Sequence, residues 1–360
     1  MESLYTGGYS HLEALFNTLQ RMKLKIMGHR KSNGKVEFGM LRSIEEYPLD
    51  ITDIQKPGYY KLEKGGKFKH SFQSPKSILI PPEHVILRVN EKLEVQPITV
   101  EEEQIALFGI KPCELAAIKV LDKVAESVNN VYYRERRKHV SLIIVEECVE
   151  AGGTCFCGSL GTGPSASNGF DLAFARIDES TIVFKPGSNK GMELVRKIGL
   201  EPAPDSVYNQ YKSIMESVKS KTSVLPPVDA LSKALEYSMG DEDLWREVSK
   251  RCVGCANCNM VCPTCFCLEI DDRFEPDGYT RIARWTGCLS PSYGEVAGGH
   301  FRPELFMRYR HFVLHKFLFY PRQIGVLGCV GCGRCITWCP LGIDLRDTLV
   351  KVFEKYGGRE

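Results

Sequence analysis

Hydrophobic positions recur at helical spacing near the start of the chain. Residues 11–23 predict an amphipathic helix, because their large apolar side chains fall on one face: Leu12, Leu15, Phe16, Leu19 and Met22. Residues 36–95 show short runs separated by Pro and Gly pairs, a pattern typical of strands joined by turns. The chain therefore opens with a helix followed by strands.

Two continuous apolar runs follow, at residues 105–110 and 140–145, and a helix is expected between them at residues 114–124. Apolar strands joined through a helix are typical of a parallel pair that is buried on both faces. We therefore predict an α/β domain over residues 1–205. The class predicted for this part of the chain is α/β or, more broadly, α+β.

The pattern becomes helical in the second half of the chain. Residues 206–245 are expected to form a helical linker, with helices near 207–221 and 228–239. The remaining part, residues 246–360, is expected to be a separate domain. Its predicted helices cover residues 241–251, 302–316 and 344–356.

Composition excludes several classes of function. The chain has 360 residues, 43% hydrophobic and 26% charged, with a net charge of +2, so neither nucleic acid nor an anionic membrane is expected as a partner. No signal peptide is recognised at the start, and the apolar residues 312–327 are interrupted by charges, so no membrane span is expected. The expected location is the cytoplasm.

Cysteine usage changes this picture. The chain has 15 Cys, an odd number without a secretion signal, which favours metal ligands over disulfides. Eight of them form two runs of the pattern C-x2-C-x2-C-x3-C-P, which end at Pro263 and Pro340. This spacing is typical of two [4Fe–4S] clusters, whereas zinc sites use pairs of C-x2-C.

In such runs the fourth Cys binds the cluster of the other run. Cluster A is therefore assigned to Cys252, Cys255, Cys258 and Cys339, and cluster B to Cys329, Cys332, Cys335 and Cys262. The long connection over residues 263–328 favours a helical ferredoxin-like dicluster domain over a compact ferredoxin.

Four further cysteines lie in the N-terminal domain. Cys113 and Cys148 follow the two buried strands, and parallel strands would bring both to the same sheet edge. Cys155 and Cys157 lie in the next loop. These four residues could bind a third cluster, or they could be small buried apolar side chains.

Three cysteines remain, at Cys265, Cys267 and Cys288. They could line the environment of the clusters, or bind an additional cluster with a non-cysteine ligand such as His300; a satisfied polar role for His300 is the alternative. Arg334 lies inside the second run and could raise the potential of cluster B, or it could be a surface residue.

No catalytic motif is recognised. The Gly-rich residues 158–163 follow a Cys loop and make a weak dinucleotide fingerprint. The chain is therefore expected to be a non-catalytic subunit. One alternative is a stand-alone oxidoreductase with its site at the N-terminal sheet edge. Another is a structural adaptor.

Several sequence motifs of the chain resemble those of a known family. The C-P-T-C-x-C ending at Cys267, the W-x2-C of Cys288, the A-G-G-H of His300 and the run from Cys329 are similar to the iron–sulfur β subunit of soluble [NiFe] hydrogenases (sulfhydrogenases) and to the A subunit of anaerobic sulfite reductase. The N-terminal Cys113-Glu114, Glu147-Cys148 and Cys155-Phe156-Cys157 extend the resemblance over the chain from about residue 105.

The resemblance implies [4Fe–4S] clusters, a neighbouring subunit that binds flavin and NAD(P)H, and a catalytic subunit that holds nickel–iron or sirohaem. The expected function is electron transfer between those two subunits. A hydrogenase complex is the first hypothesis, and a sulfite reductase or another redox complex is the second.

Overall fold

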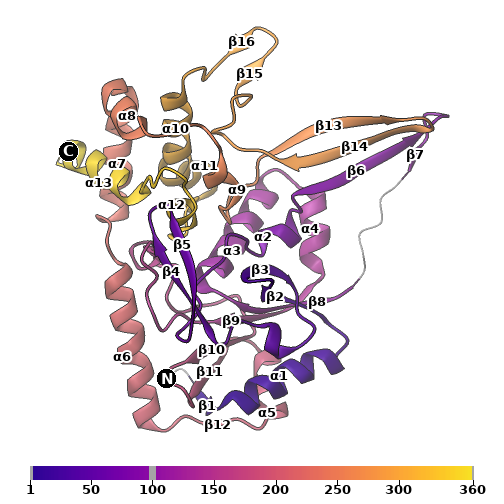
Figure 1. Ribbon diagram of the computed structural model, residues 1–360, viewed down its shortest axis with the longest axis vertical. Helices are drawn as coiled ribbons and strands as arrows, with labels where there is room; N and C mark the ends of the chain where they lie inside the picture. The colour runs from indigo at the N-terminus through magenta and orange to yellow at the C-terminus, as the bar shows by residue number, and fades with distance from the viewer. Residues whose placement is uncertain (1–2, 97–102, 359–360) are drawn as a thin grey trace.

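A mixed sheet dominates the N-terminal half in the computed structural model, which describes residues 3–96 and 103–358 (Figure 1). Its centre is parallel and contains the strands β2 (Lys25–Ser32), β8 (Ile105–Ile110), β9 (Val140–Glu146) and β10 (Leu172–Arg176). Antiparallel strands flank this centre: β3 (Lys35–Met40), β11 (Ile182–Pro186), β1 (Tyr5–Gly7) and β12 (Glu201–Pro202). The direct pairing of β8 with β9 confirms the predicted parallel pair.

Helices cover both faces of this sheet. Successive side chains of β8 point to opposite faces, so they enter two different cores. Ala106 and Phe108 pack in one core with α1 (Tyr9–Arg21), which confirms the predicted first helix. Leu107 lies in a second core with α3 (Pro112–Ser127) and α4 (Val131–Lys138). The helix α5 (Asn189–Lys197) contributes Leu194 to the first core.

A third core lies among the C-terminal helices. It contains the fully buried Trp245 and Leu349, with α7 packed against α13. The helices that contribute to it are α7 (Val228–Tyr237), α8 (Glu242–Ser249), α9 (Asn257–Met260), α10 (Leu305–Leu314), α12 (Arg334–Thr337) and α13 (Leu345–Tyr356). The helices α6 (Asp205–Thr222) and α11 (Tyr320–Ile324) contribute to smaller cores. A π-helical turn, His315–Phe319, joins α10 to α11, so the predicted helix over 302–316 continues further than expected.

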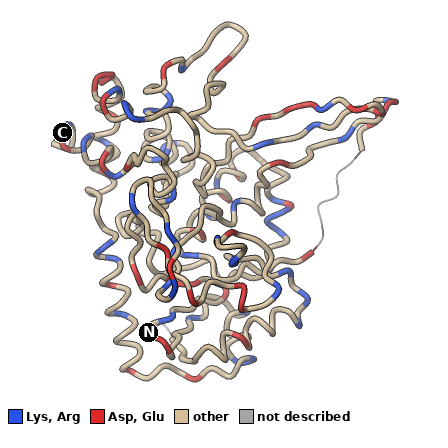
Figure 2. Tube along the Cα trace, viewed as in Figure 1, with Lys and Arg blue, Asp and Glu red and all other residues tan. Residues whose placement is uncertain are grey.

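A projecting arm joins the two halves (Figure 1). Its strands are β13 (Leu268–Glu275), β14 (Gly278–Trp285), β6 (Glu83–Asn90) and β7 (Val95–Gln96), and β14 pairs with β6 across the expected domain division. Charges of both signs lie along the arm (Figure 2), and Arg281 pairs with Asp272. The connection between the cysteine runs therefore begins as strands, and only its later part is helical as expected.

Smaller elements bring the N-terminal half against the second cysteine run. The amide of Gly58, in the hairpin of β4 (Ile51–Lys56) and β5 (Tyr59–Lys64), donates a hydrogen bond of 3.0 Å to the carbonyl of Ile336. The Tyr60 and Trp338 rings lie 4.5 Å apart between centroids. Other short elements are α2 (Lys76–Leu79), β15 (Glu295–Val296), β16 (Gly299–His300) and the 3-10 helices η1 (Ile44–Glu46), η2 (Cys157–Leu160) and η3 (Ser238–Gly240).

Candidate iron–sulfur sites

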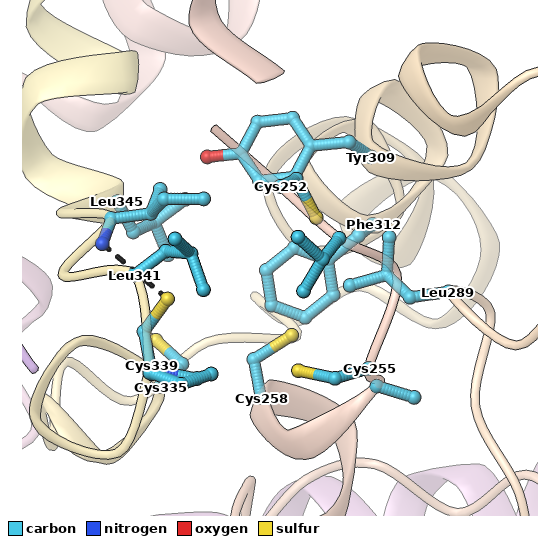
Figure 3. Close-up of a pocket in the computed structure, with 14 residues that line it drawn as sticks. Cys252, Cys255, Cys258, Leu289, Tyr309, Phe312, Cys335, Cys339, Leu341 and Leu345 are labelled. Atoms are coloured by element: carbon cyan, nitrogen blue, oxygen red, sulfur yellow. Dashed lines mark hydrogen bonds between the residues drawn. The ribbon is translucent and has the colours of Figure 1, made fainter. Parts of the chain in front are cut away.

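One cavity gathers the four cysteines assigned to cluster A. Cys252, Cys255, Cys258 and Cys339 line it, and Cys335 of the second run shares its wall (Figure 3). Its other walls are apolar and include Leu289, Phe312 and Leu345. The cavity reaches the surface, because Cys255 is exposed together with two apolar residues of its rim, Val253 and Leu341.

Both cysteine runs have the same local backbone. Gly254 and Ala256 in the first run have φ values of 70° and 56°, and the corresponding Gly331 and Gly333 have φ values of 61° and 75°. The left-handed conformation favours glycine, so Ala256 is the costlier of these positions. The repeated turn starts the short helices α9 and α12 at equivalent positions, which supports the inference that the two runs are repeats of one binding loop.

The four cysteines assigned to cluster B also approach one another. Burial, and then the neighbouring thiols of Cys329, Cys332 and Cys262, hold the pKa of Cys335 well above its usual range. The amide of Gly331 donates to the sulfur of Cys329 at 3.4 Å. Cys332 lines a further cavity, and Cys335 lines the A cavity. The B cysteines therefore lie between these two cavities.

That further cavity lies at the carboxyl edge of the parallel pair. It is lined by all four N-terminal cysteines, Cys113, Cys148, Cys155 and Cys157, as expected from the strand order. Burial raises the pKa of the Cys148 thiol to about 12 and that of Cys157 to about 11. Ligation would therefore have to displace protons from these thiols, as metal binding by cysteine does.

Two polar side chains are buried in the same cavity, and one of them, His70, lacks its usual partners among the described residues. His70 is almost fully buried, and both of its ring nitrogens lack a hydrogen-bond partner among the described residues. Lys111 lines the cavity and forms a buried ion pair with Glu146 at 2.5 Å. A group that accepts hydrogen bonds would satisfy His70, and inorganic sulfide is such an acceptor.

A buried ion network joins the second run to the N-terminal sheet. The fully buried Arg334 pairs with Glu114, and His29 lies 3.1 Å from the same carboxylate. Burial alone would raise the pKa of Glu114, but His29 and Arg334 lower it to about 2. The alternative that Arg334 is a surface residue is therefore wrong.

Arg334 also faces Cys332 of the second run. Its charge lowers the pKa of Cys332, against the larger effect of burial. Its Nε donates to the carbonyl of Ser71 at 2.8 Å. The hypothesis that Arg334 tunes the potential of cluster B remains a prediction, and this contact is compatible with it.

The three remaining cysteines lie beside the two runs. The side-chain amide of Asn259 donates to the sulfur atoms of Cys265 and Cys288, at 3.6 Å and 3.3 Å. Cys267 contributes to the raised pKa of Cys288, after the larger effect of burial, so its thiol is also near. These three residues are called the Cys288 set below.

Thiols are the metal-binding groups that line the A cavity, without His, Asp or Glu among the described residues there. Within residues 3–96 and 103–358, no three or more His, Cys, Asp or Glu side chains come together at the spacing of a single metal ion. The thiols of the A cavity instead stand around a wider space between side chains (Figure 3). Sets of cysteines around such a space fit a cluster of several irons and sulfides.

Comparison with known proteins decides the family. Residues 251–343 match the family model of the 4Fe-4S dicluster domain. The chain is also 31% identical to "Sulfhydrogenase 2 subunit beta" of Pyrococcus furiosus over 94% of its own length and 95% of that protein. The chain belongs to the sulfhydrogenase β-subunit family. The family predicted from the cysteine motifs is thereby confirmed, and the dicluster domain indicates bound iron–sulfur clusters.

As a member of this family, the chain is an iron–sulfur electron-transfer subunit. In the part of the chain that the structure describes, none of the helices combines the length and the apolar character that crossing a bilayer requires.

Several residues of the sites escaped the sequence-based prediction. Lys316, Lys76 and Asn259 contact or face cysteines, and His70 and Lys111 line the N-terminal cavity. Lys316 gave one usable signal, since it is a charged residue within the apolar residues 312–320. Asn259 and Lys111 lie close in sequence to Cys258 and Cys113, but they belong to no recognised motif. Lys76 and His70 lie far in sequence from the cysteines that they approach.

His300 does not lie free to bind a cluster. Its Nε2 is 2.6 Å from the carbonyl oxygen of Pro291, and its Nδ1 accepts from the amide of Arg302 at 2.9 Å. We expect His300→Ala to keep the iron and sulfide content of the unchanged chain, because both ring nitrogens serve the β15–β16 turn. Colorimetric iron and sulfide analysis of the anaerobically purified variant checks this, and a loss of iron would restore His300 as a ligand.

Proposed function

We propose that the chain relays single electrons between a subunit that binds flavin and NAD(P)H and the nickel–iron catalytic subunit of a cytoplasmic sulfhydrogenase complex. One observation carries the proposal: the cysteine sets share walls. Cys332 lines the N-terminal cavity, and Cys335 lines the A cavity. The sets therefore form one connected series, in the order N-terminal cavity, cluster B, cluster A.

Iron–sulfur clusters supply reversible one-electron transfer when they are bound. The four cysteines of the A cavity and the four of the B set would hold two [4Fe–4S] clusters, and the N-terminal four would hold a third. The chain's own contribution is to fix these sites on rigid elements and to surround them with apolar side chains. Phe312 and Leu345, for example, wall the A cavity from water.

The A cavity is the end of the series that a partner can reach. Cys255 is exposed there, and Val253 is 64% exposed beside it. An apolar rim around a redox site suits close docking of another subunit, because it removes water from the gap between the two redox groups. The opposite end lies at the sheet edge, where α/β domains commonly place ligands.

Buried cations favour the reduced, more negative state of a neighbouring site. Arg334 lies beside Cys332, and Lys316 donates to the sulfur of Cys262 at 3.3 Å. Both side chains are almost completely buried, so water screens their charges little. These residues are therefore the ones expected to set the potential of cluster B.

Purification of the tagged chain from its native cells tests the proposal. Flavin and nickel are expected to co-purify, and NAD(P)H is expected to reduce the clusters in the complex but not in the isolated chain. Sirohaem in place of nickel would instead identify a sulfite reductase complex. An isolated chain that oxidised NAD(P)H with an artificial acceptor would be a stand-alone oxidoreductase, which would refute the proposal.

A further inference from the structure

Two lysines are buried against the Cys288 set. Lys316 and Lys76 are 5% and 4% exposed. Nζ of Lys316 lies 3.5 Å from the sulfur of Cys265, and the same ammonium contacts the sulfur of Cys262 at 3.3 Å. Lysine is almost never buried without an anionic partner.

The other contacts of the two ammonium groups are neutral. Lys316 donates to Oγ1 of Thr264 and to the carbonyl of Gly328, both at 3.2 Å. Lys76 donates to the carbonyl of Met260 at 3.1 Å and lies 3.6 Å from the centroid of the Trp285 ring. Within the described part of the chain, neither lysine forms an ion pair with a carboxylate.

Burying two unpaired ammonium groups side by side would be strongly unfavourable. The groups that face both of them are the thiols of Cys262, Cys265 and Cys267. A negative charge on this sulfur-rich space would offset the cost. Cys262 is already assigned to cluster B, which leaves the Cys288 set to supply the rest.

Further donors point to the same sulfur atoms. The amide of Asn259 donates to Cys265 and Cys288, and neither of these thiols is exposed. Charged thiolates and sulfides accept such bonds more strongly than neutral thiols do. Three cysteines, two buried cations and one amide donor therefore converge on one place beside α10 and α11.

We propose that Cys265, Cys267 and Cys288 bind an additional iron–sulfur cluster, whose negative charge is balanced by Lys316 and Lys76. The site lies beside both predicted clusters. Cys288 is close enough to affect the pKa of Cys258, and Lys316 joins Cys265 to Cys262. The inference stands on this chain's own residues and does not depend on the proposed partner subunits.

Three thiolates leave one iron of a four-iron cluster with a ligand that is not cysteine. His300, the candidate from the sequence, is occupied by backbone groups. A cluster held by three cysteines is expected to lose that iron on mild oxidation and to become a three-iron cluster. This behaviour separates the additional site from clusters A and B, each of which has four cysteines.

The test compares the full chain with three variants, all purified anaerobically. Cys267→Ala, Cys288→Ala and the double variant are each expected to lack about four irons relative to the unchanged chain. The double variant should lose no more than either single variant, because both residues hold one group. Mild oxidation should give the EPR signal of a three-iron cluster in the unchanged chain and not in the variants.

Lys316→Met tests the charge argument, because methionine keeps much of the apolar bulk and removes the ammonium. It is expected to shift the reduction potentials of both the additional cluster and cluster B to more negative values, measured by an EPR-monitored titration, because the ammonium contacts Cys265 and Cys262. Lys351→Met is the matched control, since Lys351 is half exposed and pairs with Glu247 at the surface. Cysteine variants that retained all of their iron, or that lost more than about four irons, would overturn the proposal.

Discussion

Replacement of Cys339 by alanine is expected to remove about four irons per chain, and adding Cys258→Ala is expected to remove no more. The reason is that both residues line the same cavity, although they belong to different cysteine runs. Adding Cys332→Ala to Cys339→Ala should instead remove about eight irons, because these two residues of the second run are assigned to different clusters. Iron and sulfide analysis of the single and double variants measures both effects.

The opposite pattern would show that each run binds its own cluster. In that case Cys339→Ala with Cys332→Ala would cost no more iron than either change alone, and Cys339→Ala with Cys258→Ala would cost twice as much. Circular dichroism of each variant serves as the folding control. The comparison depends on double variants because a single cysteine change cannot tell which cluster has been lost.

Removal of the buried Arg334 is the second large effect. Arg334→Met is expected to lower the free energy of unfolding by about 3–5 kcal/mol, because it leaves the Glu114 carboxylate buried with less compensating charge. Glu114→Gln in the same chain should restore much of the loss, since it removes the uncompensated charge. Urea denaturation under anaerobic conditions, with identical protocols for all variants, measures the change.

Arg322→Met is the matched control for this prediction. Arg322 also forms an ion pair, with Glu236, but both side chains are about half exposed. Exposed pairs contribute at most about 1 kcal/mol, so its effect should be small. If Arg334→Met destabilised the chain as little as Arg322→Met, the buried network would not hold the second cysteine run against the sheet.

The sequence predicted the parts of the fold that depend on local pattern. The apolar strands β8 and β9, with α3 between them, stand out because strands buried on both faces are continuously hydrophobic. Their parallel pairing then brought Cys113 and Cys148 to one cavity, as expected from the topology alone. The spacing of the two cysteine runs indicated the two clusters. The family followed from a resemblance carried by several motifs together, among them the C-P-T-C-x-C ending at Cys267 and the W-x2-C of Cys288.

The projecting arm was missed for two different reasons. The β13–β14 hairpin carried a local signal, since Asp277-Gly278 is a dipeptide typical of tight hairpin turns. The pairing of β14 with β6 had no such signal. It joins residues 278–284 to residues 83–90, two segments that lie far apart in the sequence and that no short turn connects.

The approach of the two buried lysines, Lys316 and Lys76, to the cysteines could not have been predicted from the sequence either. Lys316 lies on a π-helical turn, and such turns occur often at functional sites but have no clear sequence pattern. Lys76 reaches the same thiols from a short helix almost two hundred positions before them. Only the tertiary structure brings these charges onto the cysteines, and the further cluster site is inferred from that convergence.

Reductive EPR titration of the anaerobically purified chain, with its iron counted, tests the relay most directly. The account predicts about sixteen irons and, on reduction with dithionite, overlapping signals broadened by magnetic coupling between neighbouring clusters. Coupling is expected because the cysteine sets share walls. Bound iron that gave no signal of a reduced cluster after dithionite would show that the clusters serve only the fold, and would contradict the account.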